Sequence, residues 1–318
     1  MAERIERQAL VPPVLALKRF DQAAAELFPE FSRSRLQAWI KTGELSVDGK
    51  TMKPREKLKG GESLRLNALV QDQVSGPENI DLEIVHEDAS LLVINKPAGM
   101  IVHPGAGNAE GTLMNALLYH DERLATLPRA GIVHRLDKET TGLLVVARTL
   151  AAHHHLGRQF SDKTAGRVYE AIVYGRVNRH GRIEAAIGRH PVYRTRMGVR
   201  ADGRLAVTHY DIVKCFDGHT HLRLNLETGR THQIRVHLQH IRHPIVGDPV
   251  YGGGFRQPPR LSSLLEETLR NFGRQALHAK KLYIVHPETQ QPIAFESPLP
   301  EDMRLLIEAL EQAQKSHE

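Results

Sequence analysis

The chain contains little cysteine and few aromatic residues, and each shortage excludes a class of protein. Among its 318 residues, Cys215 is the only cysteine, and Phe, Trp and Tyr together make up 5%. A single cysteine excludes an intramolecular disulfide and any zinc site built from several cysteines, and it favours a reducing compartment. No apolar run approaches the length that a membrane span needs. We therefore expect a cytoplasmic protein that does not cross a membrane.

A modest excess of positive charge is present instead. Lys and Arg number 43 and Asp and Glu number 37, which gives a formal net charge of +6 at pH 7. Such an excess favours a polyanionic partner such as RNA, although many basic proteins bind none. The hydrophobic content of 41% suffices for a sizeable core in two domains. Because no long apolar stripe demands a partner chain, we expect a monomer.

The first seventy residues have the pattern of a small α+β unit. Apolar residues at helical spacing predict one helix over residues 21–28, and Ser32 is a suitable N-cap for a second helix over residues 32–40. Alternating residues 45–50 then run into an Asp-Gly turn, which is typical of a hairpin. Basic side chains on the second helix and on the following loop could bind RNA phosphates or simply form a solvated surface. The candidate phosphate contacts are Arg33, Arg35, Lys53, Arg55 and Lys57.

A polar stretch around Gly76 and Pro77 separates this unit from the rest of the chain. We therefore expect a module over residues 1–72, a linker over residues 73–80 and a main domain over residues 81–318. In the main domain, strand-like and helix-like runs rarely alternate strictly, which favours an α+β fold with a mainly antiparallel mixed sheet. The expected strands are 91–95, 143–147, 169–174, 207–214 and 222–226, and the expected helices are 112–119, 153–160, 232–240 and 303–314.

The densest group of charged side chains occupies residues 131–142, directly before the apolar run 143–147. A charged loop that enters a buried strand can hold one carboxylate in a fixed position beside the core. Asp137 is therefore a candidate for nucleophilic or acid–base chemistry. Arg135 and Lys138 flank it, and on composition alone a structural ion pair is the simpler interpretation.

Two further segments carry candidate functional side chains. Gly229 predicts a turn on which the Arg230 guanidinium could reach a carboxylate or a phosphate, and Arg235 follows on the next helix. Arg167 and Tyr169 alternate on an expected strand and so share a face. Each of these residues could also be structural, with Arg230 bracing its loop and Tyr169 packing in the core.

No cofactor or metal site is predicted. The consecutive residues 153–155 are all histidine, but neighbouring helix positions point in different directions and no carboxylate supports them. His237, His240 and His243 recur every three residues without the base of a metalloprotease motif. The chain also lacks a P-loop and a complete dinucleotide fingerprint. A histidine–metal hydrolase acting on RNA is kept only as an alternative.

Residues 134–142 (HRLDKETTG) resemble the signature of the RluA family of pseudouridine synthases. Residues 95–99 (NKPAG) resemble the upstream motif of that family, and residues 229–237 (GRTHQIRVH) resemble its downstream motif. The likeness continues through residues 246–252 and 277–279 in the same order, so it covers nearly the whole chain. It is greatest to the RluD type, which carries an alpha-L RNA-binding module at its amino terminus and modifies the helix 69 loop of large-subunit (23S) ribosomal RNA.

The resemblance implies a role for each matching residue. Asp137 would be the essential aspartate, Tyr169 would pack against the target base, and Arg230 would pair with the aspartate. Arg135 matches a position that enters the RNA stack where the base leaves. The other residues expected to face RNA are His134, Lys138, Arg167, which replaces the usual lysine, and Arg235.

The implied reaction moves the glycosidic bond of uridine from ring nitrogen 1 to ring carbon 5. Nothing is oxidised and no group is donated, so no cofactor is expected. The sequence leaves open whether Asp137 attacks the ribose carbon 1′ or removes the 2′ proton. It also leaves open a synthase acting on another ribosomal or transfer RNA site, and a non-catalytic RNA-binding factor in ribosome assembly.

Overall fold

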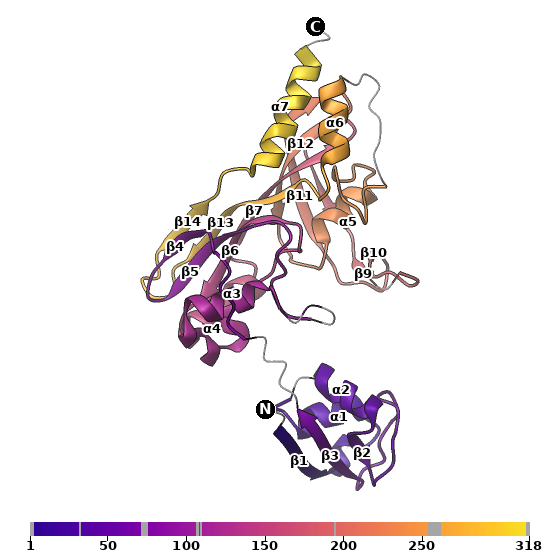
Figure 1. Cartoon of the computed structure of the whole chain (residues 1–318). Coiled ribbons are helices and arrows are strands. Elements are labelled where there is room, and N and C mark those ends of the chain that lie inside the picture. The colour runs from indigo at the N-terminus through magenta and orange to yellow at the C-terminus, as the bar shows by residue number, and fades with distance from the viewer. Residues whose placement is uncertain are drawn as a thin grey trace. The chain divides into compact units, whose positions relative to one another are not determined.

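The computed structural model describes residues 3–31, 33–70, 76–105, 108, 110–193, 195–253 and 262–315. The chain forms two compact units, Met1–Val74 and Ser75–Glu318 (Figure 1). The expected N-cap Ser32 lies outside the described residues. Among the helices that are described, none combines the length and the apolar character that crossing a bilayer requires.

The first unit is a three-stranded antiparallel sheet accompanied by two helices. The strand order is β1-β3-β2, with β1 (Glu3–Leu10), β2 (Leu45–Val47) and β3 (Ser63–Val70). Both expected helices are present, as α1 (Phe20–Leu27) and α2 (Arg33–Thr42), and a short 3-10 helix, η1 (Pro13–Leu15), precedes them. Phe20, Leu36 and Leu66 are among the side chains that fill the core of this unit.

The Asp-Gly turn of the first unit is confirmed. Asp48 and Gly49 have φ angles of 48° and 74°, a left-handed pair typical of the tight turns that join β-strands. The turn is closed by backbone hydrogen bonds between Val47 and Lys50, both 2.9 Å long. It directs the chain into the loop that carries Lys53, and β2 takes β3 as its strand partner.

The second unit contains a nine-stranded sheet, which confirms the expected α+β fold. Its order is β4-β5-β6-β13-β7-β12-β11-β8, with β14 paired to β13, and every neighbouring pair is antiparallel except β6 and β13. The strands are β4 (Ile84–Glu87), β5 (Leu91–Lys96), β6 (Thr141–Ala147), β7 (Gly166–Tyr174), β8 (Gly181–Glu184), β11 (Val207–Phe216), β12 (His219–Leu226), β13 (Leu277–Val285) and β14 (Pro292–Glu296). A separate hairpin pairs β9 (Ile187–Arg189) with β10 (Met197–Val199).

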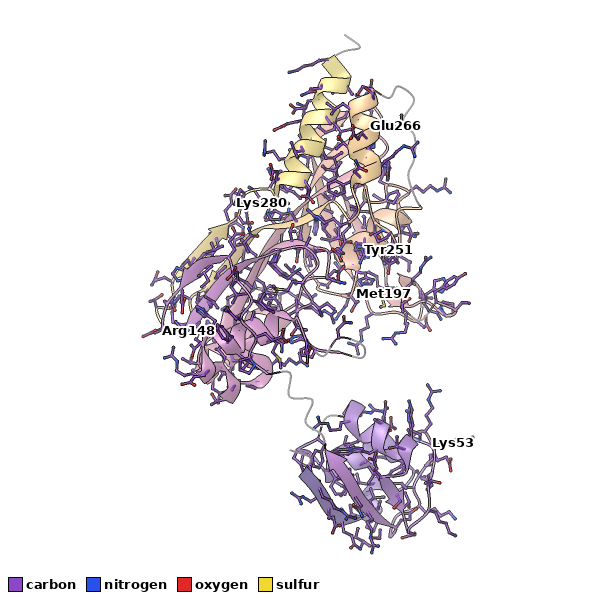
Figure 2. The ribbon with its side chains drawn as sticks, in the orientation of Figure 1. Lys53, Arg148, Met197, Tyr251, Glu266 and Lys280 are labelled. Carbon is purple, nitrogen blue, oxygen red and sulfur yellow. The ribbon has the colours of Figure 1, made fainter. Side chains whose placement is uncertain are left out.

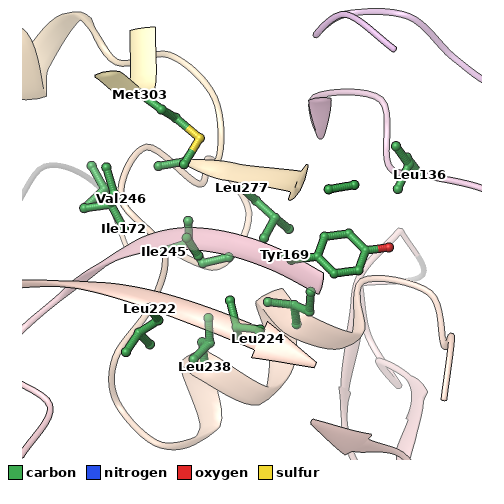
Figure 3. Packing of buried hydrophobic residues seen from close by; sticks show 14 of the residues in the cluster. Leu136, Tyr169, Ile172, Leu222, Leu224, Leu238, Ile245, Val246, Leu277 and Met303 are labelled. Carbon is green, nitrogen blue, oxygen red and sulfur yellow. The ribbon is translucent and has the colours of Figure 1, made fainter. Parts of the chain in front are cut away.

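Helices cover both faces of this sheet. Leu143 and Val145 of β6 pack in a smaller core with Leu156 of α4, whereas the alternate residues Leu144 and Val146 belong to the larger core. Figure 3 shows other members of the larger core, among them Leu222, Leu224 and Leu277. In Figure 1, α3 and α4 lie toward one end of the sheet, and α6 and α7 lie side by side toward the other. The helices are α3 (Leu113–His120), α4 (Leu150–Ser161), α5 (Gln233–His240), α6 (Ser263–Asn271) and α7 (Glu301–Lys315), with short 3-10 helices η2 (Glu122–Thr126) and η3 (Pro128–Gly131).

Part of the expected linker is bound to the second unit. Asn115 of α3 donates a hydrogen bond to the Gly76 carbonyl at 2.7 Å and accepts one from the Glu78 amide at 3.1 Å. The Glu78 carboxylate accepts a hydrogen bond from the Gly111 amide at 3.0 Å, and Ile80 packs against the larger core. Residues 76–80 therefore begin the second unit, whereas residues 71–75 lie outside the described residues.

Candidate active site

The loop that carries Asp137 is held between two glycines whose surroundings exclude any side chain. A β-carbon on Gly131 would lie 1.9 Å from the Ala147 carbonyl oxygen, and one on Gly142 would lie 2.3 Å from the Ala279 carbonyl oxygen. Both glycines also have positive φ angles, 80° and 112°, which side chains disfavour. The loop therefore enters and leaves through close backbone contacts with the sheet.

Lys96 anchors the same loop from the end of β5. Its side chain is completely buried, and its ammonium group donates to the carbonyl oxygens of Pro97, Met100 and Lys138 at 2.7, 3.0 and 2.9 Å. Burial lowers the pKa of Lys96 to about 8, although the Glu139 and Asp137 carboxylates oppose the shift. This lysine had no predicted role of its own, although it lies within the family-like motif at residues 95–99.

Asp137 forms an ion pair with Arg235, and this corrects the predicted pairing with Arg230. Arg235 Nη1 donates to Asp137 Oδ2 at 3.1 Å, and only 6% and 17% of the two side chains are exposed. Arg230 instead donates from Nε to the Leu205 carbonyl at 3.3 Å. Arg230 lies on the turn before α5, whereas Arg235 lies in the first turn of that helix, which directs it toward the loop. Arg235 was expected to contact RNA, but its guanidinium is buried between carboxylates.

Asp248 holds the Arg235 guanidinium in place. Two parallel hydrogen bonds join them, Nε to Oδ2 at 2.7 Å and Nη2 to Oδ1 at 2.9 Å, and Asp248 is itself buried. The ring of Tyr251 lies beside the guanidinium, with its centroid 4.9 Å from Arg235 Cζ. Burial alone would lower the pKa of Arg235, but Asp248 and Asp137 outweigh it and raise the pKa. Arg235 is therefore a fixed, permanently charged neighbour of Asp137.

His232 completes the surroundings of Asp137. Its Nε2 lies 3.9 Å from Asp137 Oδ1, and its Nδ1 lies 2.8 Å from the Tyr251 hydroxyl. That hydroxyl also accepts a hydrogen bond from the Met197 amide at 2.8 Å, and both labelled residues are visible in Figure 2. Burial lowers the pKa of His232 despite the opposing charge of Asp137, so we expect a neutral ring at neutral pH. Neither His232 nor Tyr251 was predicted from the sequence to be a site residue, although both lie within the family-like segments at residues 229–237 and 246–252.

Tyr169 lies in the larger core beside Leu136, the residue that precedes the aspartate (Figure 3). Only 6% of Tyr169 is exposed, and burial raises the pKa of its hydroxyl, with the Asp137 charge adding to the increase. Arg167, two residues earlier on β7, stacks on the Phe160 ring at 5.6 Å. Its Nε is buried without a hydrogen-bond partner among the described residues. The phenol is therefore protonated at neutral pH and close enough to sense the aspartate.

His134 is half-buried with its ring turned into the unit, and the RNA contact predicted for it stays a prediction. Its Nε2 accepts a hydrogen bond from the Val145 amide at 3.0 Å, and its ring stacks on Phe160 at a centroid distance of 4.3 Å. Burial lowers its pKa to about 3, so the ring is neutral and supports the aspartate loop. Arg135 and Lys138, by contrast, are exposed on either side of Asp137.

The basic side chains of the first unit differ in their contacts with the rest of that unit. Arg33 Nη2 lies 2.8 Å from Oδ2 of the fully buried Asp21, and Arg35 Cζ lies 5.9 Å from the Trp39 ring centroid. The loop residues Lys53, Arg55 and Lys57 have exposed side chains. In neither unit do the described residues include a group of three or more histidine, cysteine, aspartate or glutamate side chains that could hold a metal ion.

Comparison with known proteins identifies the family. Residues 90–240 match the family model described as RNA pseudouridylate synthase. The "Ribosomal large subunit pseudouridine synthase D" of Pseudomonas aeruginosa is 54% identical over 315 residues, 98% of each chain, and that of Xanthomonas campestris is 52% identical over 96% of this chain and 92% of its own.

A solved structure of an RNA pseudouridylate synthase domain is also similar to this chain. "Human RNA Pseudouridylate Synthase Domain Containing 4" is 26% identical, with a TM-score of 0.56 over 72% of this chain and 93% of its own. The aspartate loop from Gly131 to Gly142 lies inside the region that the family model matches. The chain belongs to the family of RNA pseudouridylate synthases and is an isomerase that converts uridine in RNA to pseudouridine.

Proposed function

We propose that this enzyme isomerises specific uridines of large-subunit (23S) ribosomal RNA, with the loop of helix 69 as the expected target. The names of relatives that match almost end to end support ribosomal RNA as the substrate. The observation that carries the proposal is the Asp137 carboxylate, held 3.1 Å from a guanidinium that is itself fixed by Asp248. No other acidic side chain of the aspartate loop has such a partner among the described residues.

Asp137 starts the reaction as an ionised carboxylate. It either attacks the ribose carbon 1′ or removes the 2′ proton, and both routes require the negative charge. A bound uridine removes water from the carboxylate, which on its own disfavours that charge. The fixed charge of Arg235 compensates, because an opposite charge within hydrogen-bond distance stabilises the ionised form. Asp248 takes two of the guanidinium's donors and leaves Nη1 for Asp137.

A stacked uridine must leave its helix before Asp137 can reach its sugar. Arg135 is exposed two residues before the aspartate and is suitably placed to fill the gap that the flipped base leaves. Unstacking costs a few kcal/mol, which such a wedge can partly offset. Tyr169 presents a protonated phenol ring next to the aspartate, against which the flipped base can pack. We assign the exposed cations of the first unit to phosphate binding.

The test is to delete the gene and map pseudouridines chemically across ribosomal and transfer RNA. We expect the modification to disappear from the helix 69 loop, to return with the wild-type gene and to stay absent with Asp137→Asn. Asparagine keeps the shape and loses the charge, so Asp137→Asn should still bind the RNA. Loss of pseudouridine from a different ribosomal or transfer RNA site would show that the target is that site and not the helix 69 loop. Full restoration of pseudouridine by Asp137→Asn would refute the mechanism.

A further inference from the structure

A cleft lies beside the active site, between the carboxyl end of α5 and the residues that follow Asp248. It has a volume of about 530 Å³, and its walls include Arg196, Gln239, Arg242 and Tyr251. This volume falls within the range of sites that bind nucleotide-sized ligands. The aspartate, Tyr169 and Arg135 are not part of its lining, so the cleft is separate from the position expected for the target base.

The charge of the cleft is unbalanced. Neither Arg196 nor Arg242 forms an ion pair within the described part of the chain, both side chains are exposed, and no acidic residue lines the cleft. Other arginines of the same region do have carboxylate partners, since Arg200 lies 2.7 Å from Asp202 and Arg182 contacts Glu184. Two unpaired guanidinium groups in one cleft favour an anion, and their planar fork suits phosphate oxygens.

Both arginines extend from fixed positions. Arg196 Cζ lies 5.1 Å from the Tyr193 ring centroid, and the next residue, Met197, donates its amide to the Tyr251 hydroxyl. Arg242 follows α5 in a left-handed conformation with φ of 66°, and its amide donates to the Gln239 carbonyl at 2.9 Å. Because the backbone at both arginines is held by these contacts, the ordering that an anion requires is confined to the two side chains.

Tyr251 is shared between the cleft and the active site. Its ring lines the cleft and also lies 4.9 Å from Arg235 Cζ, the residue that pairs with Asp137. The cleft is therefore near enough to Asp137 for a phosphate close in sequence to the target uridine to reach it. A free phosphorylated molecule offers the same chemistry, but it has no reason to bind next to an RNA-modifying site.

We propose that the cleft between α5 and Gly253 binds a backbone phosphate of the substrate RNA near the target uridine, through Arg196 and Arg242. This inference rests on the proposed function for the identity of the RNA. The contact would fix the strand while the uridine is turned out, so it contributes to binding and to register and leaves the chemical step to Asp137 and Arg235.

The test compares the full-length wild type with Arg196→Gln/Arg242→Gln and with Arg196→Lys/Arg242→Lys. The charge-matched control is Arg158→Gln/Arg223→Gln, because Arg158 lies on α4 and Arg223 alternates with the core residues Leu222 and Leu224, which places both on the other face of the sheet. Affinity for a fluorescent transcript of the helix 69 region is measured from 50 to 300 mM salt. Single-turnover conversion is measured with saturating enzyme.

We expect the double Gln variant to raise Kd about tenfold at 0.15 M salt and to flatten the slope of log K against log salt by about 0.7, the value for one phosphate contact. The saturated rate should equal that of the wild type, the Lys pair should keep the wild-type slope, and the control pair should do so as well. An unchanged slope in the double Gln variant overturns the proposal, as does an equal loss in the control pair. An unchanged slope would also be the result if the cleft held a free phosphorylated molecule or an acidic protein instead of RNA.

The outcomes separate the cleft from the proposed function. Binding and its salt dependence are measured without turnover, so they test the cleft even if the wild type leaves the transcript unmodified. Failure of the wild type to convert the transcript counts against the proposed target alone. Conversion by the wild type together with wild-type binding by the double Gln variant counts against the cleft alone.

Discussion

The basic loop of the first unit and the active site of the second unit use positive charge in opposite ways. In the first unit, Lys53, Arg55 and Lys57 have exposed side chains on one loop. In the second unit, the decisive cations are buried: Lys96 donates to three carbonyl oxygens, and Arg235 bridges two carboxylates. An exposed cation attracts a polyanion over a distance that salt screens, whereas a buried and paired cation is held in one geometry. We therefore expect RNA affinity to depend on salt and on the exposed loop cations, and the rate of isomerisation to depend on the buried ion pairs.

The largest effect should come from shortening the buried guanidinium. Arg235→Lys keeps the charge but cannot hold Asp248 with two hydrogen bonds and still reach Asp137. We expect the single-turnover rate to fall about 10³-fold, or about 4 kcal/mol, with little change in RNA affinity. Arg230→Gln is the matched comparison, because Arg230 was the partner expected from sequence, and it should lose far less. If Arg230→Gln were the more damaging change, the pairing with Arg235 would not be the functional one.

The buried charge of Lys96 should make the free energy of unfolding depend on pH. Because burial lowers the pKa of Lys96 to about 8 from 10.5, the unfolded chain binds more protons at this site between those pH values. Its contribution to the free energy of unfolding should therefore rise with pH across that window, by up to about 3 kcal/mol. Urea unfolding of wild type and Lys96→Met from pH 7.5 to 10.5 measures the difference. Parallel curves for the two proteins would contradict a lowered pKa.

Asp248 should act on the reaction through Arg235 without touching RNA. Asp248→Asn keeps the size of the side chain but loses the charge and replaces one acceptor oxygen with an amide donor, so the guanidinium is oriented less firmly. We expect about a tenfold lower single-turnover rate, or about 1.4 kcal/mol, an unchanged Kd and an altered pH dependence of the rate. Asp202→Asn, which removes an exposed partner of Arg200, is the control and should leave the rate unchanged. A merely structural Asp248 would lower stability and leave the pH profile as it is.

The smallest energetic effect per side chain is expected in the first unit. Lys53→Gln/Arg55→Gln/Lys57→Gln should raise Kd for ribosomal RNA several-fold and flatten the salt slope by about 2, while the saturated rate stays constant. Filter binding at several salt concentrations, with single-turnover assays beside it, separates the two quantities. A slower saturated rate with unchanged binding would contradict the assignment of RNA binding to this loop.

Much of the fold was predictable where periodicity is strong. The helices expected over residues 112–119 and 153–160 are found at residues 113–120 and 150–161, because their apolar residues recur at helical spacing and Thr112 and Thr149 cap their first turns. The strand β1 and the helix α6 were not predicted. Their sequences, ERIERQAL and SLLEETLRN, mix charged and apolar residues without a decisive local pattern, so their conformation depends on β3 and α7 beside them.

For the active site, the sequence alone located the charged stretch over residues 131–142 and identified Asp137 within it as the candidate carboxylate. Only the tertiary structure decided that Arg235, 98 residues away, is the partner of Asp137 and that Arg230 is not. The physical reason is that ion pairing depends on distance in space. That distance is set by the direction in which α5 leaves its turn and by the two hydrogen bonds that Arg235 donates to Asp248. Neither can be derived from local sequence.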